Sequence, residues 1–100
     1  MIRGTTPKHK FVLPFTVDNV ATARVVYSQS RTVIFVKTGD DLILSGNQIE
    51  IHLTQADTLS FRPRETVEIQ VRILTPNGDA LASGIHTTTV ECCLENEVME

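Results

Sequence analysis

The side chains in this sequence that could perform chemistry are three histidines, two adjacent cysteines and one pair of adjacent aspartates. His9, His52 and His86 are far apart in the chain, and no two of them have the spacing of a local metal-binding motif. A metal or catalytic site would require His52 and His86 to converge in the fold with a carboxylate such as Glu50. We favour solvent-facing strand positions for these histidines, and we expect neither a metal ion nor a cofactor.

The cysteines and the aspartates have simple structural interpretations. Cys92 and Cys93 are adjacent, which would strain a disulfide between them, and the chain has no third cysteine. We interpret both as reduced thiols, one filling a strand face and the other exposed, with a redox or metal-binding role as the alternative. Asp40 and Asp41 fall in a turn, and nothing nearby suggests the cleft that acid–base catalysis needs. The sequence also lacks a phosphate-binding loop, a nucleophile elbow and a zinc-protease motif, so we do not expect an enzyme.

The composition predicts one small domain over residues 1–100. The chain is 41% hydrophobic and contains 5 Gly, 4 Pro and 2 Cys, which excludes intrinsic disorder, collagen and a disulfide scaffold. The polar opening MIRGTTPKHK is not followed by the apolar stretch of a secretion leader. The longest apolar run, Val33–Val36, is far shorter than the roughly 20 residues of a membrane-spanning helix. We therefore expect synthesis in the cytoplasm and no membrane partner, with fraying confined to residues 1–8 and 96–100.

The alternation of apolar and polar residues predicts strands. The chain has 13 Thr, 11 Val and 8 Ile, and β-branched side chains favour a pleated sheet over a helix. Every second residue of Glu65–Leu74 is apolar, and Gln48–Leu53 repeats this pattern. We expect these two segments to be antiparallel neighbours around one core. The same test predicts five further strands: Lys10–Phe15, Arg24–Gln29, Thr32–Lys37, Asp41–Ser45 and Ile85–Leu94.

Short turns are expected between these strands, with one exception. The Gly-Asp, Gly-Asn and Pro-Asn-Gly-Asp sequences supply the backbone conformations of tight turns. The spacing of Thr54 and Asp57 instead matches a capping box, which predicts a single helical turn, with Leu59 and Phe61 closing the end of the core. Strands at intervals of about 8 to 12 residues indicate an all-β fold. We predict a single seven-strand antiparallel β-sandwich, immunoglobulin-like rather than a small barrel, with at most one short helical turn near residues 54–59.

The charge balance argues against a nucleic-acid partner. The net charge is −3, and one Tyr and four Phe provide no stacking platform for bases. The charge is nevertheless uneven, since residues 1–37 carry six basic groups and one acid, whereas residues 38–100 carry three basic groups and eleven acids. Opposed halves could steer copies of the chain together, but we favour cross-strand pairing of basic and acidic residues within one fold.

The segment Arg31–Lys37 has apolar residues on both faces between two flanking charges. Such a strand is normally covered twice, either at the centre of its own sheet or by another subunit. A central position is the simpler interpretation, and a protein contact is the alternative.

Three segments carry a resemblance to a protein family: MIRGTTPKHKFVLPF, LTQADTLSFRP and VEIQVRILTPNGDALAS. They resemble small proteins of similar length encoded in phages and prophages of low-GC Gram-positive bacteria. Members of that family read GTTP, a His-containing LPF segment, LTQ with an acidic residue, and IQVR followed by LT, a turn and ALAS. The chain departs from the family at Lys8 and Lys10, where Thr is common, and at Ala56, where Glu is common. The resemblance implies a virion-structure module grouped with tail or baseplate genes.

We therefore expect a non-enzymatic structural or assembly component of a phage or prophage particle, in the tail or baseplate. Its partners would be other virion proteins or copies of itself in a homo-oligomer. The alternative is a soluble host-interaction or carbohydrate-adhesion module, for which Tyr27 is the single tyrosine available as an aromatic platform. The side chains expected to make contacts come from the N-terminal segment and from an outward strand row: Lys8, His9, Lys10, Glu68, Gln70 and Arg72.

Overall fold

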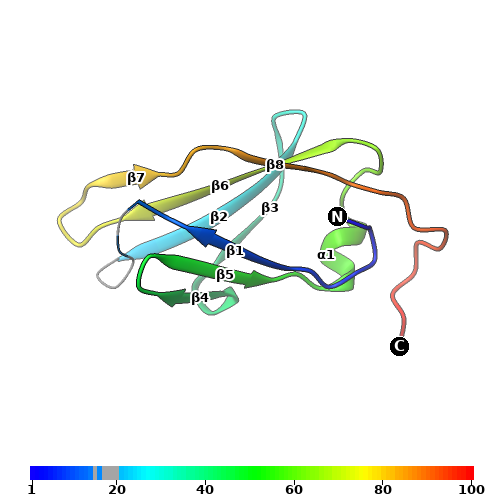
Figure 1. The fold of residues 1–100 in the computed structure, drawn as a ribbon, viewed down its shortest axis with the longest axis horizontal. Coiled ribbons are helices and arrows are strands. Elements are labelled where there is room, and N and C mark those ends of the chain that lie inside the picture. Colours follow the sequence, from blue (N-terminus) through cyan, green and yellow to red (C-terminus); the bar gives the residue numbers. More distant parts are fainter. Residues whose placement is uncertain (15, 17–20) are drawn as a thin grey trace.

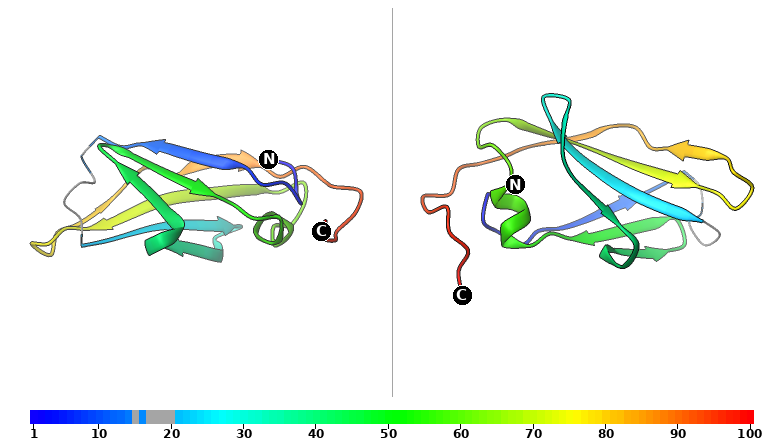
Figure 2. Two further views of the ribbon diagram at one scale, coloured as in Figure 1. Left: turned by 90° about the horizontal axis from the view of Figure 1, so that it is seen from below. Right: turned by 180° about the vertical axis from the view of Figure 1, so that it is seen from behind.

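The computed structural model describes residues 1–14, 16 and 21–100, which form an all-β domain of two antiparallel sheets (Figure 1, Figure 2). The larger sheet has the order β3 (Thr32–Thr38), β2 (Thr22–Gln29), β6 (Thr66–Leu74) and β7 (Ala80–Ala82), and β8 (His86–Thr89) also pairs with β6. The smaller sheet has the order β1 (Lys8–Val12), β5 (Gln48–His52) and β4 (Leu42–Ser45).

The strand order is that of an immunoglobulin-like sandwich, as the sequence predicts. β7 and β8 pair with opposite halves of β6, so together they occupy the place of one interrupted strand. The sheets then correspond in order to the B-E-D and C′-C-F-G strands of immunoglobulin domains. A parallel bridge between Ile2 and Glu91 places the start of the chain beside the segment that follows β8. Both termini consequently lie at one end of the molecule, and β7 lies at the other (Figure 1).

The described residues contain one strand more than the seven predicted. The additional strand is β7, whose Ala-Leu-Ala sequence has no β-branched residue and gives no strand signal. The predicted last strand ends early, at Thr89, because the chain then changes partner: the Glu91 N–H donates to Met1 O. The predicted first strand begins earlier, at Lys8, and Phe15 at its predicted end lies outside the described residues.

The core forms between the sheets from the inward residues of their central strands. The alternation in β6 buries every second side chain, as predicted. β5 buries its own alternate residues from the opposite sheet, so the prediction that these two segments are antiparallel neighbours is wrong. They share the core by facing each other, because each sheet has one apolar face to bury. The buried side chains of the two strands are Ile49, Ile51, Val67, Ile69, Val71 and Ile73.

β3 lies at an edge of the larger sheet, so a central position for the segment Arg31–Lys37 is wrong. No side chain of β3 is fully buried, and Val33 and Val36 are 56% and 38% exposed. The register with β2 shifts between Tyr27 and Ser28, which adds a residue to β3 and breaks its alternation. This irregularity explains why apolar residues occur on both faces of β3, although the other sheet packs against only one face of it. The 3-10 turn η1 (Gly39–Asp41) follows it, at the predicted Gly-Asp turn.

A capping box builds the short helix α1 (Gln55–Leu59), which confirms the predicted helical turn. The Asp57 N–H donates to the Thr54 hydroxyl at 3.1 Å, and the Thr54 N–H donates to the Asp57 carboxylate at 2.9 Å. Leu59, the last residue of the helix, is half-buried and Phe61 just after it is buried, so this end of the core is closed.

Both ends of the chain, where the sequence predicts fraying, make hydrogen bonds to the body of the domain. The Arg3 guanidinium donates to Leu59 O at 2.9 Å and to the Asn96 side chain at 2.7 Å. Near the other end, the Met99 N–H donates to the Gln55 side-chain oxygen at 2.8 Å. α1 and its flanking residues therefore hold both terminal segments.

A buried amide joins β2 to the loop before β6. Gln29 is completely buried. Its side-chain nitrogen donates to Arg62 O at 2.9 Å, and its side-chain oxygen accepts from the Arg62 N–H at 2.8 Å. The amide thus takes the place of a neighbouring strand for this loop residue. Both bonds matter because a buried polar group without a partner costs free energy.

Replacing Gln29 with Met keeps the length of the side chain and removes both hydrogen bonds. We expect the free energy of unfolding to fall by about 1–3 kcal/mol, because the Arg62 backbone groups lose their partners. Urea denaturation measures this loss, and Gln48→Met, at an exposed position of β5, is the matched control. Equal stability of the two variants would contradict the role assigned to Gln29.

Candidate functional site

The predicted N-terminal contact residues lie on β1, in the smaller sheet. Lys8 and Lys10 are exposed and stand opposite His52 and Glu50 of β5 in the register. His9 lies between the lysines, points to the other face and is half-buried. All three residues are therefore positions of the first strand, which begins two residues earlier than predicted, and only the two lysines face the solvent.

His9 belongs to a cluster of aromatic rings at the core. Its Nδ1 lies 2.8 Å from the hydroxyl oxygen of Tyr27, and the two rings stack with their centroids 5.8 Å apart. The Tyr27 ring is completely buried and also packs against Phe35 and Phe61. Burial lowers the pKa of His9 below its ordinary 6.5, and the positive chain terminus lowers it further. Burial raises the pKa of Tyr27 far above its ordinary value, with a smaller contribution from the negative charge of Asp57, so the hydroxyl keeps its proton.

The other two histidines are not members of the His9–Tyr27 pair, although His86 packs on Phe11, whose ring also contacts His9. His52 is exposed, and its Nε2 is 3.3 Å from the Glu50 carboxylate. His86 is exposed on β8, in the other sheet, and its ring packs against Phe11 with centroids 5.3 Å apart. Across residues 1–14, 16 and 21–100, no group of three or more His, Cys, Asp or Glu side chains could hold a metal ion.

The cysteines do not lie on a strand face as the sequence predicts. Cys92 is exposed, Cys93 is half-buried, and both are free thiols in the segment that follows β8. The reason is the change of partner beyond Thr89, which ends the strand before it reaches them.

The second predicted contact set, Glu68, Gln70 and Arg72, lies on the outward face of β6 in the larger sheet. The Glu68 carboxylate accepts from the Arg31 N–H at 3.5 Å, and the Gln70 amide donates to Ser83 O at 3.1 Å. These contacts leave Glu68 and Gln70 half-buried, whereas Arg72 is exposed. The two predicted sets lie in different sheets, so they do not form one surface.

Arg72 stands directly opposite Arg24 of β2, a residue that the sequence analysis did not single out. We call these two residues the arginine pair. Both are exposed, and neither takes part in an ion pair within the described part of the chain. Like charges on directly opposed strand residues repel each other. A guanidinium is always charged and offers a planar fork of donors that matches a carboxylate, so the pair has unused capacity for anionic groups.

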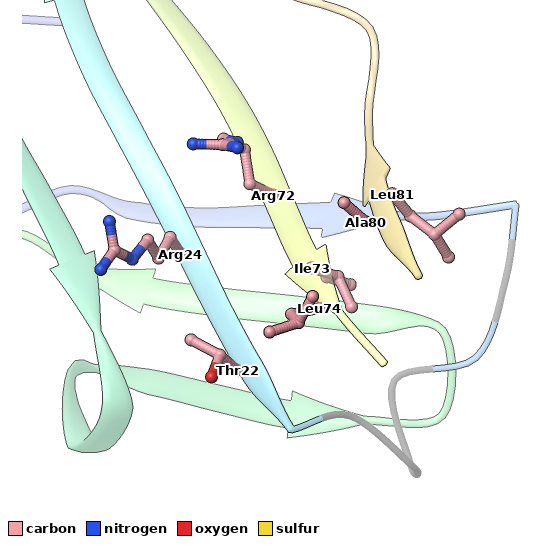
Figure 3. A pocket seen from close by; sticks show the side chains of 7 residues that line it. All are labelled: Thr22, Arg24, Arg72, Ile73, Leu74, Ala80 and Leu81. Carbon is pink, nitrogen blue, oxygen red and sulfur yellow. The ribbon is translucent and has the colours of Figure 1, made fainter. Parts of the chain in front are cut away.

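The arginine pair lines a pocket of about 290 Å³ at the ends of β2, β6 and β7, which we call the arginine pocket (Figure 3). Two leucines, Leu74 and Leu81, give it an apolar part, and they are 42% and 39% exposed. Among the described residues, the two arginines are the only titratable side chains that line it. The arrangement therefore suits a ligand that combines carboxylates with an apolar group. The remaining lining residues are Thr22, Ile73 and Ala80.

Elsewhere, opposite charges pair within the fold. Lys37 Nζ lies 2.9 Å from the Asp57 carboxylate, and both side chains are less than one-fifth exposed, at 17% and 18%. Burial alone would raise the pKa of Asp57, but hydrogen bonds from the Thr54 N–H and from Lys37 outweigh this effect and lower it. This pair joins a strand to a helix, and none of the ion pairs in the described residues is of the cross-strand kind that the sequence analysis favoured. Arg24 and Arg72 form no such pair in the described part of the chain, and the same is true of Lys8, Lys10, Arg31 and Arg64; the arginine pair differs from these in that its two like charges stand directly opposite each other.

No protein-family model matches this chain, and no curated protein matches it. Among solved structures it is similar to the V domain of amphioxus IgVJ-C2, with 13% sequence identity over 90% of this chain and 96% of that chain, at a TM-score of 0.36. The immunoglobulin-like class itself rests on the order and register of the strands. The described residues include no helix long and apolar enough to cross a membrane.

We expect the free energy of unfolding to decrease as the pH falls below 6.5. Unfolded His9 has its ordinary pKa of 6.5, and the folded protein lowers this pKa, so below pH 6.5 the unfolded state binds more protons. Replacing His9 with Gln removes this contribution and keeps a hydrogen-bonding group near Tyr27. Urea denaturation at a series of pH values from about 7 to about 5 measures the effect. His52→Gln, at an exposed position, is the control, and its free energy of unfolding should still decrease at low pH. If the free energy of unfolding of the His9 variant depends on pH as in the wild type, His9 is not the source of the decrease.

Replacing Arg72 with Gln removes the repulsion within the arginine pair. We expect the free energy of unfolding to rise by about 0.5 kcal/mol at low salt, and the gain to shrink as salt screens the wild-type repulsion. Thermal unfolding at two salt concentrations measures both effects. Lys8→Gln removes an equal charge from the other sheet and should give no such gain. A loss of stability in the Arg72 variant would show that the repulsion is already compensated.

Proposed function

We propose that this chain is a non-enzymatic structural or assembly component of a phage or prophage particle, in its tail or baseplate, and that it acts through protein–protein contacts. The observation that carries the proposal is the arginine pair beside the exposed leucines of the arginine pocket. Opposed like charges lower the stability of the free domain, and exposed leucines beside them give it no benefit. A partner that brings carboxylates and an apolar side chain would reverse both costs.

The edge of the larger sheet supports the same function. β3 leaves Val33 and Val36 exposed, and its outer backbone edge has no neighbouring strand among the described residues. Exposed apolar edge strands promote pairing with other chains. The sequence resemblance to small virion proteins gives the biological setting, because many weak contacts become strong when they are repeated in a symmetric assembly.

The alternative of carbohydrate adhesion depends on an aromatic platform at Tyr27. That ring is completely buried, and its hydroxyl is hydrogen-bonded to His9. It therefore has no face on which a sugar could stack, and nothing in the described residues favours this alternative.

Mass spectrometry of purified particles tests the proposal directly. Particles induced from a lysogen that encodes the chain should contain it at a fixed ratio to the other tail proteins. In a strain that lacks the gene, a plasmid copy with Arg24→Glu and Arg72→Glu should be incorporated less than the wild type. The matched control, Lys8→Glu with Lys10→Glu, makes the same charge change on the other sheet and should be incorporated like the wild type. Absence of the wild-type chain from the particles would overturn the proposal.

A further inference from the structure

We propose that the arginine pocket binds a second copy of this chain through the acidic segment Leu94–Glu97 of that copy. This inference rests on the proposed function, because it names the protein partner of the same surface. In the contact, Leu94 packs against the exposed leucines of the pocket, while Glu95 and Glu97 pair with Arg24 and Arg72.

The segment has the chemistry that the pocket lacks. Residues 91–100 contain four glutamates and no basic residue. Leu94 is fully exposed, at 106%, and therefore gains no burial from its own domain. Glu95 and Glu97 follow it within three residues and are both exposed. A solvent-exposed leucine between carboxylates matches a pocket in which solvent-exposed leucines lie beside two arginines.

The segment cannot reach the pocket of its own chain. Its backbone is fixed at Glu91, whose N–H donates to Met1 O at 2.7 Å and whose carbonyl accepts from the Arg3 N–H at 3.1 Å. Further along, the Asn96 side chain accepts from the Arg3 guanidinium at 2.7 Å, and the Met99 N–H donates to the Gln55 side chain of α1 at 2.8 Å, so the segment is held at this end of its own domain. The last residue of β8, Thr89, pairs with Thr66 at the start of β6. Arg72 lies six residues further along β6, about 20 Å from Thr66. In this structure the segment 94–97 can therefore meet the pocket only on another copy of the chain.

The two halves of the proposed contact lie at opposite ends of the domain. The pocket is formed at one end of the domain, where β7 meets the ends of β2 and β6. The acidic segment lies near α1 and the N-terminus, at the other end of a body 47 Å long (Figure 1, Figure 2). A contact between different surfaces of identical copies is heterologous, and its repetition gives either a closed ring or an open filament.

Charge exchange between the two surfaces tests this contact. Sedimentation velocity of the purified full chain over about a hundredfold range of concentration should show reversible self-association that weakens with salt. Either R24E/R72E or E95R/E97R alone should weaken this association about tenfold or more, because like charges then meet in the contact. An equimolar mixture of the two variants should associate again, since each then offers a surface that complements the other. Leu94→Ser should weaken association without a change of charge.

Two matched controls separate the contact from general effects. K8E/K10E changes the net charge by the same amount as R24E/R72E and should associate like the wild type. Val12→Ser removes another exposed apolar side chain, from β1, and should also have no effect. Urea denaturation of each variant confirms that it is folded.

The inference is overturned if the wild type remains monomeric at every concentration, or if the mixture of charge-reversed variants associates no better than either alone. Incorporation of such a monomeric chain into particles would leave the proposed function standing and refute only self-association. Self-association of a chain that is absent from particles would refute the virion role and leave this contact intact.

Discussion

The pairing of β2 with β6 is the constraint on which the rest of the structure depends. These strands form the centre of the larger sheet and pair over seven residues, with Val25 opposite Val71 on the buried face. A slip of one residue would turn every apolar side chain of one strand toward the solvent, so the apolar core fixes the register strongly. The same register necessarily sets the outward face, and it places Arg24 directly opposite Arg72.

A surface feature that is unfavourable in the free domain is thus maintained by a favourable core. The arginine pair cannot be relieved by moving one strand, because burial of the inward residues is worth far more than the repulsion of two exposed charges. Some charges are paired within the fold, as Lys37 is with Asp57 of α1. Places where a domain departs from a local stability rule, such as the rule against like charges on opposed strand residues, tend to mark functional surfaces. The arginine pocket is such a place.

Polar groups inside the domain add specificity to the apolar packing. Gln29 binds both backbone groups of Arg62, and the hydroxyl of Tyr27 meets His9 at the inner face of β1. Each of these contacts joins segments that are distant in the sequence and would be costly to leave unsatisfied. They link the edge of the smaller sheet and the loop after α1 to β2, so the two sheets are held in one relative position as well as packed together.

The sequence by itself determined the fold class, because the period of two in segments such as Val67–Ile73 requires one buried face, and the Thr54–Asp57 spacing requires only local hydrogen bonds. It also placed Arg72 on the outward face of its strand. It could not reveal β7, which forms only because β6 offers an unpaired edge to a sequence with no strand preference of its own. Nor could it bring together His9 and Tyr27, or the two arginines, because strand partners are chosen by how two sheets bury a common core. That choice depends on contacts between residues far apart in the chain, which only the tertiary structure decides.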